Sequence, residues 1–494
     1  MRVTLKVQVE HLSIRHNLDL YNDNQTEKLI RKIAERLEVG TSVAAAVLTE
    51  LTDELEKYRL AEIEKQSIGQ DKRKMLAPEE VKVAQDYLKA PNLMGRTKED
   101  IGRSGVIGEE INRLLMYLIF TSRKRENPLH IISLGSSGIG KTHLQEKVAA
   151  LIPEEDKLEI TTLSGNAFYY FGQQELRNKL ILIEDMDGAE EVLYPLREIK
   201  SKRRITKTVV IKNTKGETRT VTLKVEGPVC VAGCTTKERL YEDNANRSFL
   251  IYIDESAAQD EQIMSYQRKL SAGRIDVYKA EGIQELLKNT QRVLQPVQVR
   301  NPYAEHLQIP KEVFKPRRTN AHYLAFIEAV TYYHQYQREK QHDKATGEEY
   351  INTTIEDIEE TNKLMKEVLL RKSDDLTGAC RNYFERLKGW LKVRDKDLSA
   401  KAKVQVGSFT NKEVRQALRI NASNQKRYMV ELQTGYYIRK AKGNQAQGFR
   451  YEVLSMEEYE QLKQGITGVL DEIVKKLRNQ SASSGQKIRK SKVQ

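Results

Sequence analysis

The stretch Gly135-Ser-Ser-Gly-Ile-Gly-Lys141-Thr142 directly follows the apolar run His130-Ile-Ile-Ser-Leu134 and precedes a segment with helical character. This is the pattern of a phosphate-binding loop, GxxxxGK followed by Ser or Thr, in the order of strand, loop and helix that such a loop requires. Its glycines let backbone N–H groups converge on a triphosphate, and the N-terminus of the following helix favours negative charge. The alternative is a glycine-rich turn in which Lys and Thr follow by chance.

Two side chains at the end of this loop carry the expected chemistry of nucleotide binding. Lys141 would reach the β- and γ-phosphates, and Thr142 would hold Mg²⁺ through its hydroxyl. The sequence therefore predicts ATP and Mg²⁺ as ligands. The predicted nucleotide-binding residues are Gly135, Gly138, Gly140, Lys141 and Thr142.

A second apolar strand, Leu180-Ile-Leu-Ile183, ends in the acidic sequence Glu184-Asp185-Met-Asp187. A buried parallel strand that delivers carboxylates at its C-terminal end is what a Mg²⁺–nucleotide site needs. By position, we assign Glu184 to the metal and Asp185 to activation of the attacking water. The alternative is an acidic strand end that faces solvent.

A third apolar strand begins at Pro228 and ends in Thr235 and Thr236. A polar residue at such a strand end can sense the γ-phosphate, and Thr235 is the predicted sensor. A pair of threonines at a strand end can equally be a simple cap. Downstream, Arg247 precedes the apolar strand 249–253, a position that suits an arginine finger supplied to the γ-phosphate of a neighbouring subunit. The alternative for Arg247 is a surface salt bridge.

The segment 203–226, between the acidic strand and the Thr235 strand, predicts a long basic β-hairpin. Two arms rich in β-branched residues surround Asn-Thr-Lys-Gly, and Lys and Arg recur along both arms. Several copies of such a hairpin at a central pore could hold a phosphodiester backbone without reading its sequence. The predicted DNA contacts are Lys212, Lys215 and Arg219. The alternative is an exposed hairpin whose charges prevent aggregation.

The segment 408–454 predicts two short helices followed by a basic hairpin, which is the order of a winged helix. Gln425, Lys426 and Arg427 fall at the predicted exposed start of the second, recognition helix. Lys426 and Arg427 are the candidates for contact with duplex DNA. Such modules also bind proteins, and the sequence leaves that alternative open.

The chain has 494 residues, a net charge of +13 and 31% charged residues. This length predicts about three or four domains, and the basic excess favours an anionic partner such as nucleic acid. No apolar run approaches a membrane span of about 20 residues. Three cysteines, Cys230, Cys234 and Cys380, are too few for a disulfide framework, so we expect a reducing cytoplasm, with no membrane partner.

The expected fold class is α/β, with a phosphate-binding parallel sheet, a helical N-terminal region, a helical lid and a C-terminal winged helix. The expected domains are an α+β region at 1–74, the ATPase core at 75–276, a helical lid at 277–400, a winged helix at 401–465, and a helix with a disordered basic tail at 466–494.

The order of these motifs resembles that of the AAA+ helicases with a hairpin before the first sensor strand, a clade that includes the minichromosome-maintenance helicases. Ile183-Glu-Asp-Met-Asp187 is similar to their acidic strand, and Asn246-Arg247-Ser-Phe249 to their arginine-finger turn. Over about residues 75–375 the chain more closely resembles the ATPase half of zinc-finger/toprim DNA primase–helicases of bacterial mobile elements. Matching stretches include Gly105-Val-Ile-Gly-Glu-Glu-Ile-Asn112 and Cys234-Thr-Thr236.

This resemblance implies a ring-forming, DNA-dependent ATPase, with a homo-hexamer as the expected assembly. Arg318, at the start of a helix in the lid, is implied as a second sensor arginine. The chain lacks recognisable zinc-finger cysteines and a toprim acidic cluster, so a separate primase is the implied partner. The residues carried over directly are Lys141, Thr142, Glu184, Asp185, Thr235 and Arg247.

Two functions follow from these patterns. The first is a bacterial cytoplasmic helicase or translocase in mobile-element replication, with single-stranded DNA in a central pore and duplex DNA at the winged helix. The second is an ATP-switched DNA-binding regulator that recruits or loads a transposase or primase without unwinding. The basic hairpin favours the first, because a switch needs no grip on a threaded strand.

Overall fold

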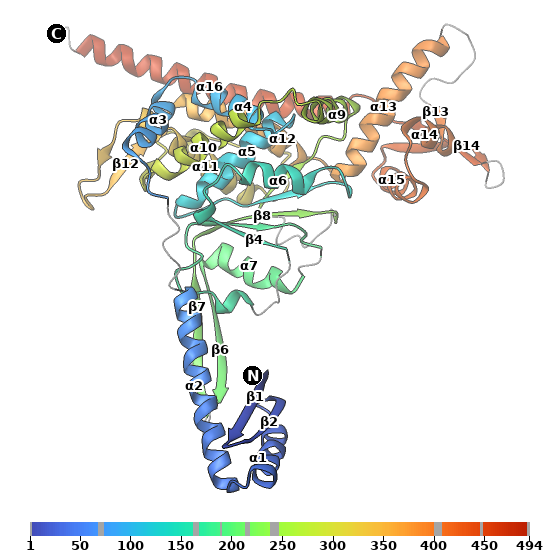
Figure 1. The fold of residues 1–494 in the computed structure, drawn as a ribbon. Helices are drawn as coiled ribbons and strands as arrows, with labels where there is room; N and C mark the ends of the chain where they lie inside the picture. Colours follow the sequence, from blue (N-terminus) through green and yellow to red (C-terminus); the bar gives the residue numbers. More distant parts are fainter. Residues whose placement is uncertain are drawn as a thin grey trace. The chain divides into compact units, whose positions relative to one another are not determined.

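The computed structural model describes residues 2–67, 74–161, 167–187, 190–212, 218–237, 247–399, 408–444 and 448–491. The chain divides into two compact units, Met1–Met75 and Leu76–Gln494, and each is described by itself (Figure 1). Among the described residues, no helix combines the length and the apolar character needed to cross a bilayer.

The N-terminal unit is a β-hairpin with two helices. Strands β1 (Arg2–Val9) and β2 (Leu12–Asp19) pair antiparallel, and α1 (Asp23–Leu37) and α2 (Thr41–Ser67) follow. The side chain of Asn22 caps α1 by accepting from the N–H of Gln25. The unit has an apolar core of its own, which includes Leu18, Leu29 and Ile33.

The second unit is built around a five-stranded sheet. Its strands are β3 (Ile131–Leu134), β4 (Lys157–Ile160), β5 (Lys179–Ile183), β8 (Val229–Thr235) and β9 (Phe249–Tyr252), in the order β4-β5-β8-β3-β9. All four pairings are parallel. The predicted α/β fold is therefore confirmed. Because β8 separates β3 from β5, its C-terminal end lies between the phosphate-binding loop and the acidic segment.

Helices cover both faces of this sheet, and alternate strand residues face them. On β8, Cys230 and Ala232 belong to one apolar cluster, while Val229 and Val231 belong to the other. In chain order, the helices described between residues 78 and 372 are α3 (Pro78–Lys89), α4 (Leu93–Arg103), α5 (Glu110–Thr121), α6 (Lys141–Ala149), α7 (Glu190–Lys202), α9 (Ala257–Ser271), α10 (Val277–Val293), α11 (Pro316–Tyr333) and α12 (Ile355–Lys372).

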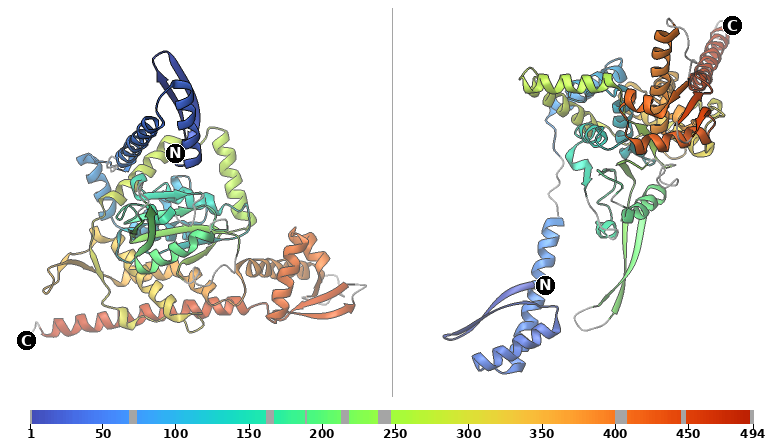
Figure 2. Two further views of the ribbon diagram at one scale, coloured as in Figure 1. Left: turned by 90° about the horizontal axis from the view of Figure 1, so that it is seen from below. Right: turned by 90° about the vertical axis from the view of Figure 1, so that its right-hand side faces the viewer.

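Strands β6 (Arg204–Lys212) and β7 (Thr218–Glu226) form a hairpin over the predicted span, with Arg204 opposite Glu226 and Lys212 opposite Thr218. Ile205 and Val225 are buried at its base, and the two strands extend away from the parallel sheet (Figure 2). The predicted turn, with Lys215, lies outside the described residues.

The region predicted as a purely helical lid also contains a small sheet. Strand β12 (Glu349–Asn352) pairs with β10 (Gln298–Arg300) and with β11 (Gln341–His342). Two reasons explain why a helical pattern failed here. A turn at Gly347, which has φ of 73°, separates β11 from β12, and the side chain of Ile351 enters the core as part of an alternating strand.

The C-terminal module contains α13 (Gly378–Ser399), β13 (Ser408–Thr410), α14 (Asn411–Leu418), α15 (Ala422–Thr434), β14 (Ile438–Asn444) and β15 (Gly448–Val453). Its sheet order is β13-β15-β14. Phe384 and Leu387 of α13 pack with Val414 and Leu432 in one cluster. Packing therefore places α13 with this module, whereas the sequence analysis assigned 378–399 to the lid.

Helix α16 (Glu458–Ser491) corrects two expectations about the end of the chain. The boundary expected at residue 465 falls inside this helix, and the tail expected to be disordered is helical through Ser491. Ile466 and Leu470 of α16 belong to the same apolar cluster as α12. This packing nucleates a helix that then continues into a Ser-rich segment whose composition alone does not favour it.

Candidate functional site

The phosphate-binding loop connects β3 to α6, and its backbone explains its glycines. Gly135, Gly138 and Gly140 have φ of 151°, 83° and 92°. These are values that residues with a Cβ atom rarely adopt. A Cβ atom built on Gly138 or Gly140 would meet no atom within 4 Å, so open space borders the loop on that side. The loop thus has both the conformation and the room to accept phosphates.

Lys141 is the first residue of α6 and is buried. Its Nζ donates to the carbonyl oxygens of Gly135 at 2.9 Å and Ser136 at 2.5 Å. Burial lowers the pKa of Lys141, although nearby acidic groups, including Asp187 and Glu255, act in the opposite direction. An ammonium group held only by carbonyl oxygens is available to a phosphate, which is a stronger partner.

The acidic residues lie at the C-terminal end of β5, as predicted. Glu184 is half-buried, and Asp185 is exposed and accepts from the backbone N–H of Asp187 at 2.8 Å. Among the described residues, no cluster of three or more His, Cys, Asp or Glu side chains could hold a metal ion. Mg²⁺ at nucleotide sites usually takes only one or two protein ligands and completes its shell with phosphates and water. Thr142 and Glu184 fit that requirement, and their role stays a prediction.

The hydroxyl of Thr235 contacts a carboxylate to which the sequence analysis gave no role. Thr235 Oγ1 donates to Asp187 Oδ1 at 2.5 Å, and Thr236 donates to Asp187 Oδ2 from its N–H at 3.0 Å and its Oγ1 at 2.6 Å. Burial acts to raise the pKa of Asp187, but these hydrogen bonds outweigh it and the net pKa is lowered. The ionised Asp187 therefore fixes the end of β8 next to the loop.

Glu255 is a second residue that the sequence analysis did not assign. It follows β9, and its Oε1 lies 3.5 Å from the backbone nitrogen of Ser136 in the phosphate-binding loop. A signal for both residues exists in the sequence, because Asp187 and Glu255 follow apolar strands at the same edge of a parallel sheet. Only the order of the strands shows that this edge surrounds Lys141.

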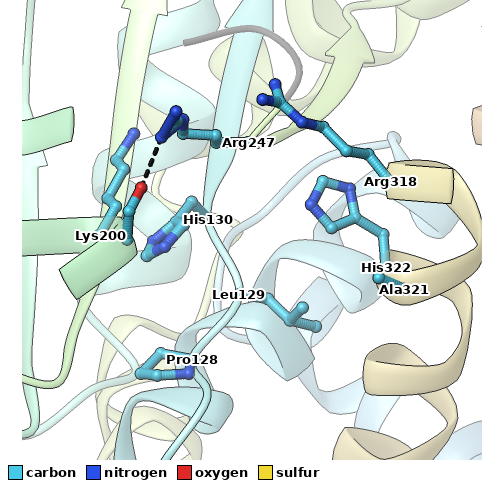
Figure 3. Close-up of a pocket in the computed structure, with 9 residues that line it drawn as sticks. Pro128, Leu129, His130, Lys200, Arg247, Arg318, Ala321 and His322 are labelled. Atoms are coloured by element: carbon cyan, nitrogen blue, oxygen red, sulfur yellow. Dashed lines mark hydrogen bonds between the residues drawn. The ribbon is translucent and has the colours of Figure 1, made fainter. Parts of the chain in front are cut away.

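The two predicted arginines lie together at the opposite edge of the sheet. Arg247 precedes β9, Arg318 is in the first turn of α11, and both line a pocket of about 350 Å³ (Figure 3). His130, which precedes β3, is also part of its wall. Since β3 and β9 are parallel, this pocket and the phosphate-binding loop lie at opposite ends of the same strands.

Arg247 has an incompletely satisfied guanidinium group. Its Nη1 donates to Ser201 Oγ at 2.5 Å, and its Nε is buried without a hydrogen-bond partner among the described residues. A buried donor without an acceptor costs free energy, which an incoming anion would recover. The salt bridge that was the alternative role for Arg247 is not among the ion pairs of the described residues.

The predicted DNA-binding residues lie at two separate places. Lys426 and Arg427 are exposed on α15, and the guanidinium of Arg427 lies 5.0 Å from the ring of Tyr428. Gln425, also expected to be exposed, is instead buried and donates to the carbonyl of Asn411 at 2.8 Å. It faces the apolar side of α15, because it precedes the buried Tyr428 by one turn.

On the β6–β7 hairpin, the backbones of Lys212 and Arg219 lie in neighbouring positions near the free end, where Ile211 pairs with Arg219. Their contact with DNA stays a prediction.

Comparison with known families identifies the central region. Residues 81–296 match the family model of the MTBMA_p00010 P-loop domain, so the chain contains a P-loop domain. The matched region includes Lys141, Asp187, Thr235 and Arg247 but not Arg318. No curated protein is significantly similar to the chain.

Two solved structures are similar to part of the chain at low sequence identity. A "putative ATPase" from Cytophaga hutchinsonii is 14% identical, with a TM-score of 0.31 over 60% of this chain and 97% of that one. A full-length MCM homologue from Methanopyrus kandleri is 11% identical, with a TM-score of 0.38 over 61% of this chain and 64% of that one. The function proposed below rests on the residues of this chain.

Proposed function

We propose that the chain is a ring-forming ATPase that uses hydrolysis to move along DNA or to separate its strands. The observation that carries this proposal is the placement of Lys141 and Arg247 at opposite ends of β3 and β9. A four-residue strand such as β3 is about 13 Å long. Arg247 is therefore too far away to act on a nucleotide in its own subunit, but a neighbour in a head-to-tail ring can present it.

The residues around the loop have distinct roles in this reaction. Backbone N–H groups of the loop and Lys141 bind the phosphates, and Thr142 and Glu184 would hold Mg²⁺, which neutralises charge that develops on the phosphates. Asp185 orients the attacking water and accepts its proton. Thr235 would sense the γ-phosphate by turning its single hydroxyl proton from Asp187 to a phosphate oxygen, while Arg247 and Arg318 come from the neighbour.

Two basic surfaces support DNA as the partner. The β6–β7 hairpin carries Lys212 and Arg219 far from the core, and α15 exposes Lys426 and Arg427. The hairpin suits the backbone of a single strand in a pore, and α15 suits duplex DNA. A homo-hexamer, a partner primase and a role in mobile-element replication remain predictions of the sequence.

The test is hydrolysis and unwinding by the purified protein on a forked duplex. We expect ATP hydrolysis that DNA stimulates, strand separation that requires ATP, and loss of both in Lys141→Ala. Hydrolysis without strand separation or movement would instead support the regulator that loads a transposase or primase. Absence of hydrolysis in the wild-type chain, with nucleotide and DNA supplied, would refute the proposal.

A further inference from the structure

The pocket that contains Arg247 and Arg318 holds more positive charge than two arginines supply. Lys200 and two histidines, His130 and His322, also line it. None of the described residues that line it carries a carboxylate. Figure 3 shows Lys200 and Arg247 on one side of the pocket and Arg318 and His322 on the other. Such a lining favours an anionic ligand.

Lys200, near the end of α7, is a half-buried cation with only a weak partner. Its Nζ lies 3.4 Å from Ser248 Oγ. The pKa of Lys200 is lowered to about 8, mainly by burial; Cys230 acts to raise this pKa, and the charge of Arg247 acts to lower it. A half-buried ammonium group without an opposite charge beside it has lost part of its hydration, and this favours a ligand that supplies that charge.

Glu198, an acidic residue on the same helix as Lys200, does not supply this charge. Glu198, one turn before Lys202 on α7, is close enough to Arg247 for their charges to interact, but it pairs with Lys202 at 2.5 Å. Cys230, on the neighbouring strand, stays a neutral thiol because burial raises its pKa to about 12. The charge on this side of the pocket is therefore positive.

His322, on the opposite wall, contacts a second half-buried lysine, Lys372. The Nζ of Lys372 lies 3.4 Å from Nδ1 of His322, and burial lowers the pKa of Lys372 to about 8. The pKa of His322 falls to about 3, because of burial and the charges of Lys372 and Arg318. Burial also holds the pKa of His130 well below its usual value. Near neutral pH both histidines are uncharged, and the lysines and arginines carry the charge.

We propose that this pocket binds a terminal phosphate group and that Lys200 is the cation that completes the site. The two arginines can each donate two hydrogen bonds to phosphate oxygens, and Lys200 adds a point charge on the side of the pocket that holds Arg247. Within the proposed function, this phosphate is the γ-phosphate of the neighbouring subunit's nucleotide. The other source of the same chemistry is free inorganic phosphate.

Phosphate binding has a defined pH dependence in this site. A bound dianion favours the charged form of Lys200, so its pKa rises when phosphate binds. Above pH 8 the empty pocket has lost the proton of Lys200, and binding must take it up again. Affinity therefore falls as the pH rises above about 8, and an arginine at position 200, which stays charged, removes that loss.

The first experiment measures binding of inorganic phosphate by calorimetry to the Lys141→Ala chain, in which the phosphate-binding loop is disabled. Lys200→Met in this background is expected to weaken binding at least tenfold. Lys202→Met is the matched control, because Lys202 lies two residues away, 68% exposed. Equal binding by the Lys200→Met and Lys202→Met chains would overturn the proposal for free phosphate. If the chain with Lys141→Ala alone binds no phosphate, free inorganic phosphate is also excluded as the ligand.

The second experiment measures the rate of ATP hydrolysis from pH 7 to pH 9.5. The wild-type rate is expected to fall above pH 8, Lys200→Arg to hold its rate there, and Lys200→Met to be at least tenfold slower throughout. Lys372→Arg, measured alongside, separates the two lysines, and Lys141 is the same in every variant. Parallel pH profiles for wild type and Lys200→Arg, with less than a twofold loss in Lys200→Met, would overturn the γ-phosphate source.

The two experiments separate this proposal from the function on which it rests. If the wild-type chain hydrolyses no ATP, the proposed function fails, yet phosphate binding that Lys200→Met removes would still establish the pocket. If hydrolysis proceeds, but Lys200→Met binds phosphate like Lys202→Met and the pH profiles of wild type and Lys200→Arg are parallel, the pocket proposal fails while the ATPase stands.

Discussion

Asp187 and Thr235 are joined by a hydrogen bond of 2.5 Å between the threonine hydroxyl and the aspartate Oδ1. The bond connects the C-terminal end of β8 to the segment that follows β5, next to the phosphate-binding loop. With its proton directed at Asp187, the hydroxyl of Thr235 has a fixed orientation before any nucleotide binds. Preorganisation of this kind matters for transition-state charge more than for ground-state binding.

We therefore expect Asp187→Asn to impair hydrolysis and to spare nucleotide binding. The amide keeps one acceptor oxygen, which cannot serve both threonines as the carboxylate does. The rate should fall about 10- to 100-fold, while the nucleotide Kd changes by less than about threefold. Steady-state kinetics and a fluorescent-nucleotide titration measure the two quantities. Thr236→Val is the control, and an equal loss in that variant would show that Thr235 is not the important partner.

Mixed rings test whether Arg247 acts across subunits. Lys141→Ala lacks a functional loop, and Arg247→Ala lacks the arginine, so each should be inactive alone. In an equal mixture, about one interface in four pairs an intact loop with an intact arginine, and hydrolysis should reappear in proportion. Activity is measured after mixing and compared with the two separate preparations. A mixture as inactive as its components would mean that Arg247 does not complete a neighbour's site.

Neutralising the hairpin should separate DNA stimulation from basal hydrolysis. Replacement of Lys212, Lys215 and Arg219 by Ala removes three charges at or near the free end and leaves the sheet unchanged. Stimulation by single-stranded DNA should disappear, and the rate without DNA should stay within about twofold, because Thr235 and Lys141 are unaffected. Lys224→Ala, at the base of the hairpin, is the control. A large drop in the basal rate would contradict this division.

Salt dependence tests the contact of α15 with duplex DNA. Lys426→Ala with Arg427→Ala should weaken duplex binding and reduce the slope of log K against log salt by about 2. Fluorescence anisotropy at several salt concentrations measures that slope. Lys463→Ala, an exposed change on α16, should leave it unaltered. An unchanged slope in the double variant would favour a protein partner for this module.

We expect the stability of the C-terminal module to be sensitive to substitution of Arg381. Its guanidinium, 2% exposed, donates to both oxygens of Asp374 at 2.8 and 2.7 Å and to Glu458 of α16 at 2.7 Å. Arg381→Met leaves the buried Asp374 without its cation, whereas Glu458 keeps Lys388, and should lower the free energy of unfolding by about 3 kcal/mol. Denaturant titration measures it, with the exposed Lys392→Met as control. Equal stability of the two variants would show that the cluster contributes little.

The sequence indicated the phosphate-binding loop and the parallel sheet because both depend on local order. The glycine spacing around Lys141 requires only its own backbone, and the apolar strands are short and continuous. The hydrogen bond between Asp187 and Thr235 depends on β8 lying beside β5, and no single stretch of the sequence determines that strand order. The pocket around Lys200 is less predictable still, because α7, α11 and the segments that precede β3 and β9 supply its side chains from separate parts of the chain.

The remaining differences have similar causes. Gln425 looks like a surface residue by type, but one turn separates it from the buried Tyr428, and α14 offers a carbonyl to its amide. Helix α13 follows the lid in sequence, yet its apolar face meets α15 and β14. The composition of residues 480–491 predicted a disordered tail, whereas the helix that packs through Ile466 and Leu470 continues to Ser491.

Strands β7 and β8 follow one another along the chain with only Gly227 and Pro228 between them. One end of this length of backbone reaches the free end of the hairpin, and the other carries the hydroxyl of Thr235. A load on the hairpin is thus transmitted through covalent bonds to the catalytic edge of the sheet. This backbone segment would couple ATP hydrolysis to movement of the hairpin. Insertion of one residue at position 227 should lengthen the segment, so that ATP is hydrolysed with less movement of DNA.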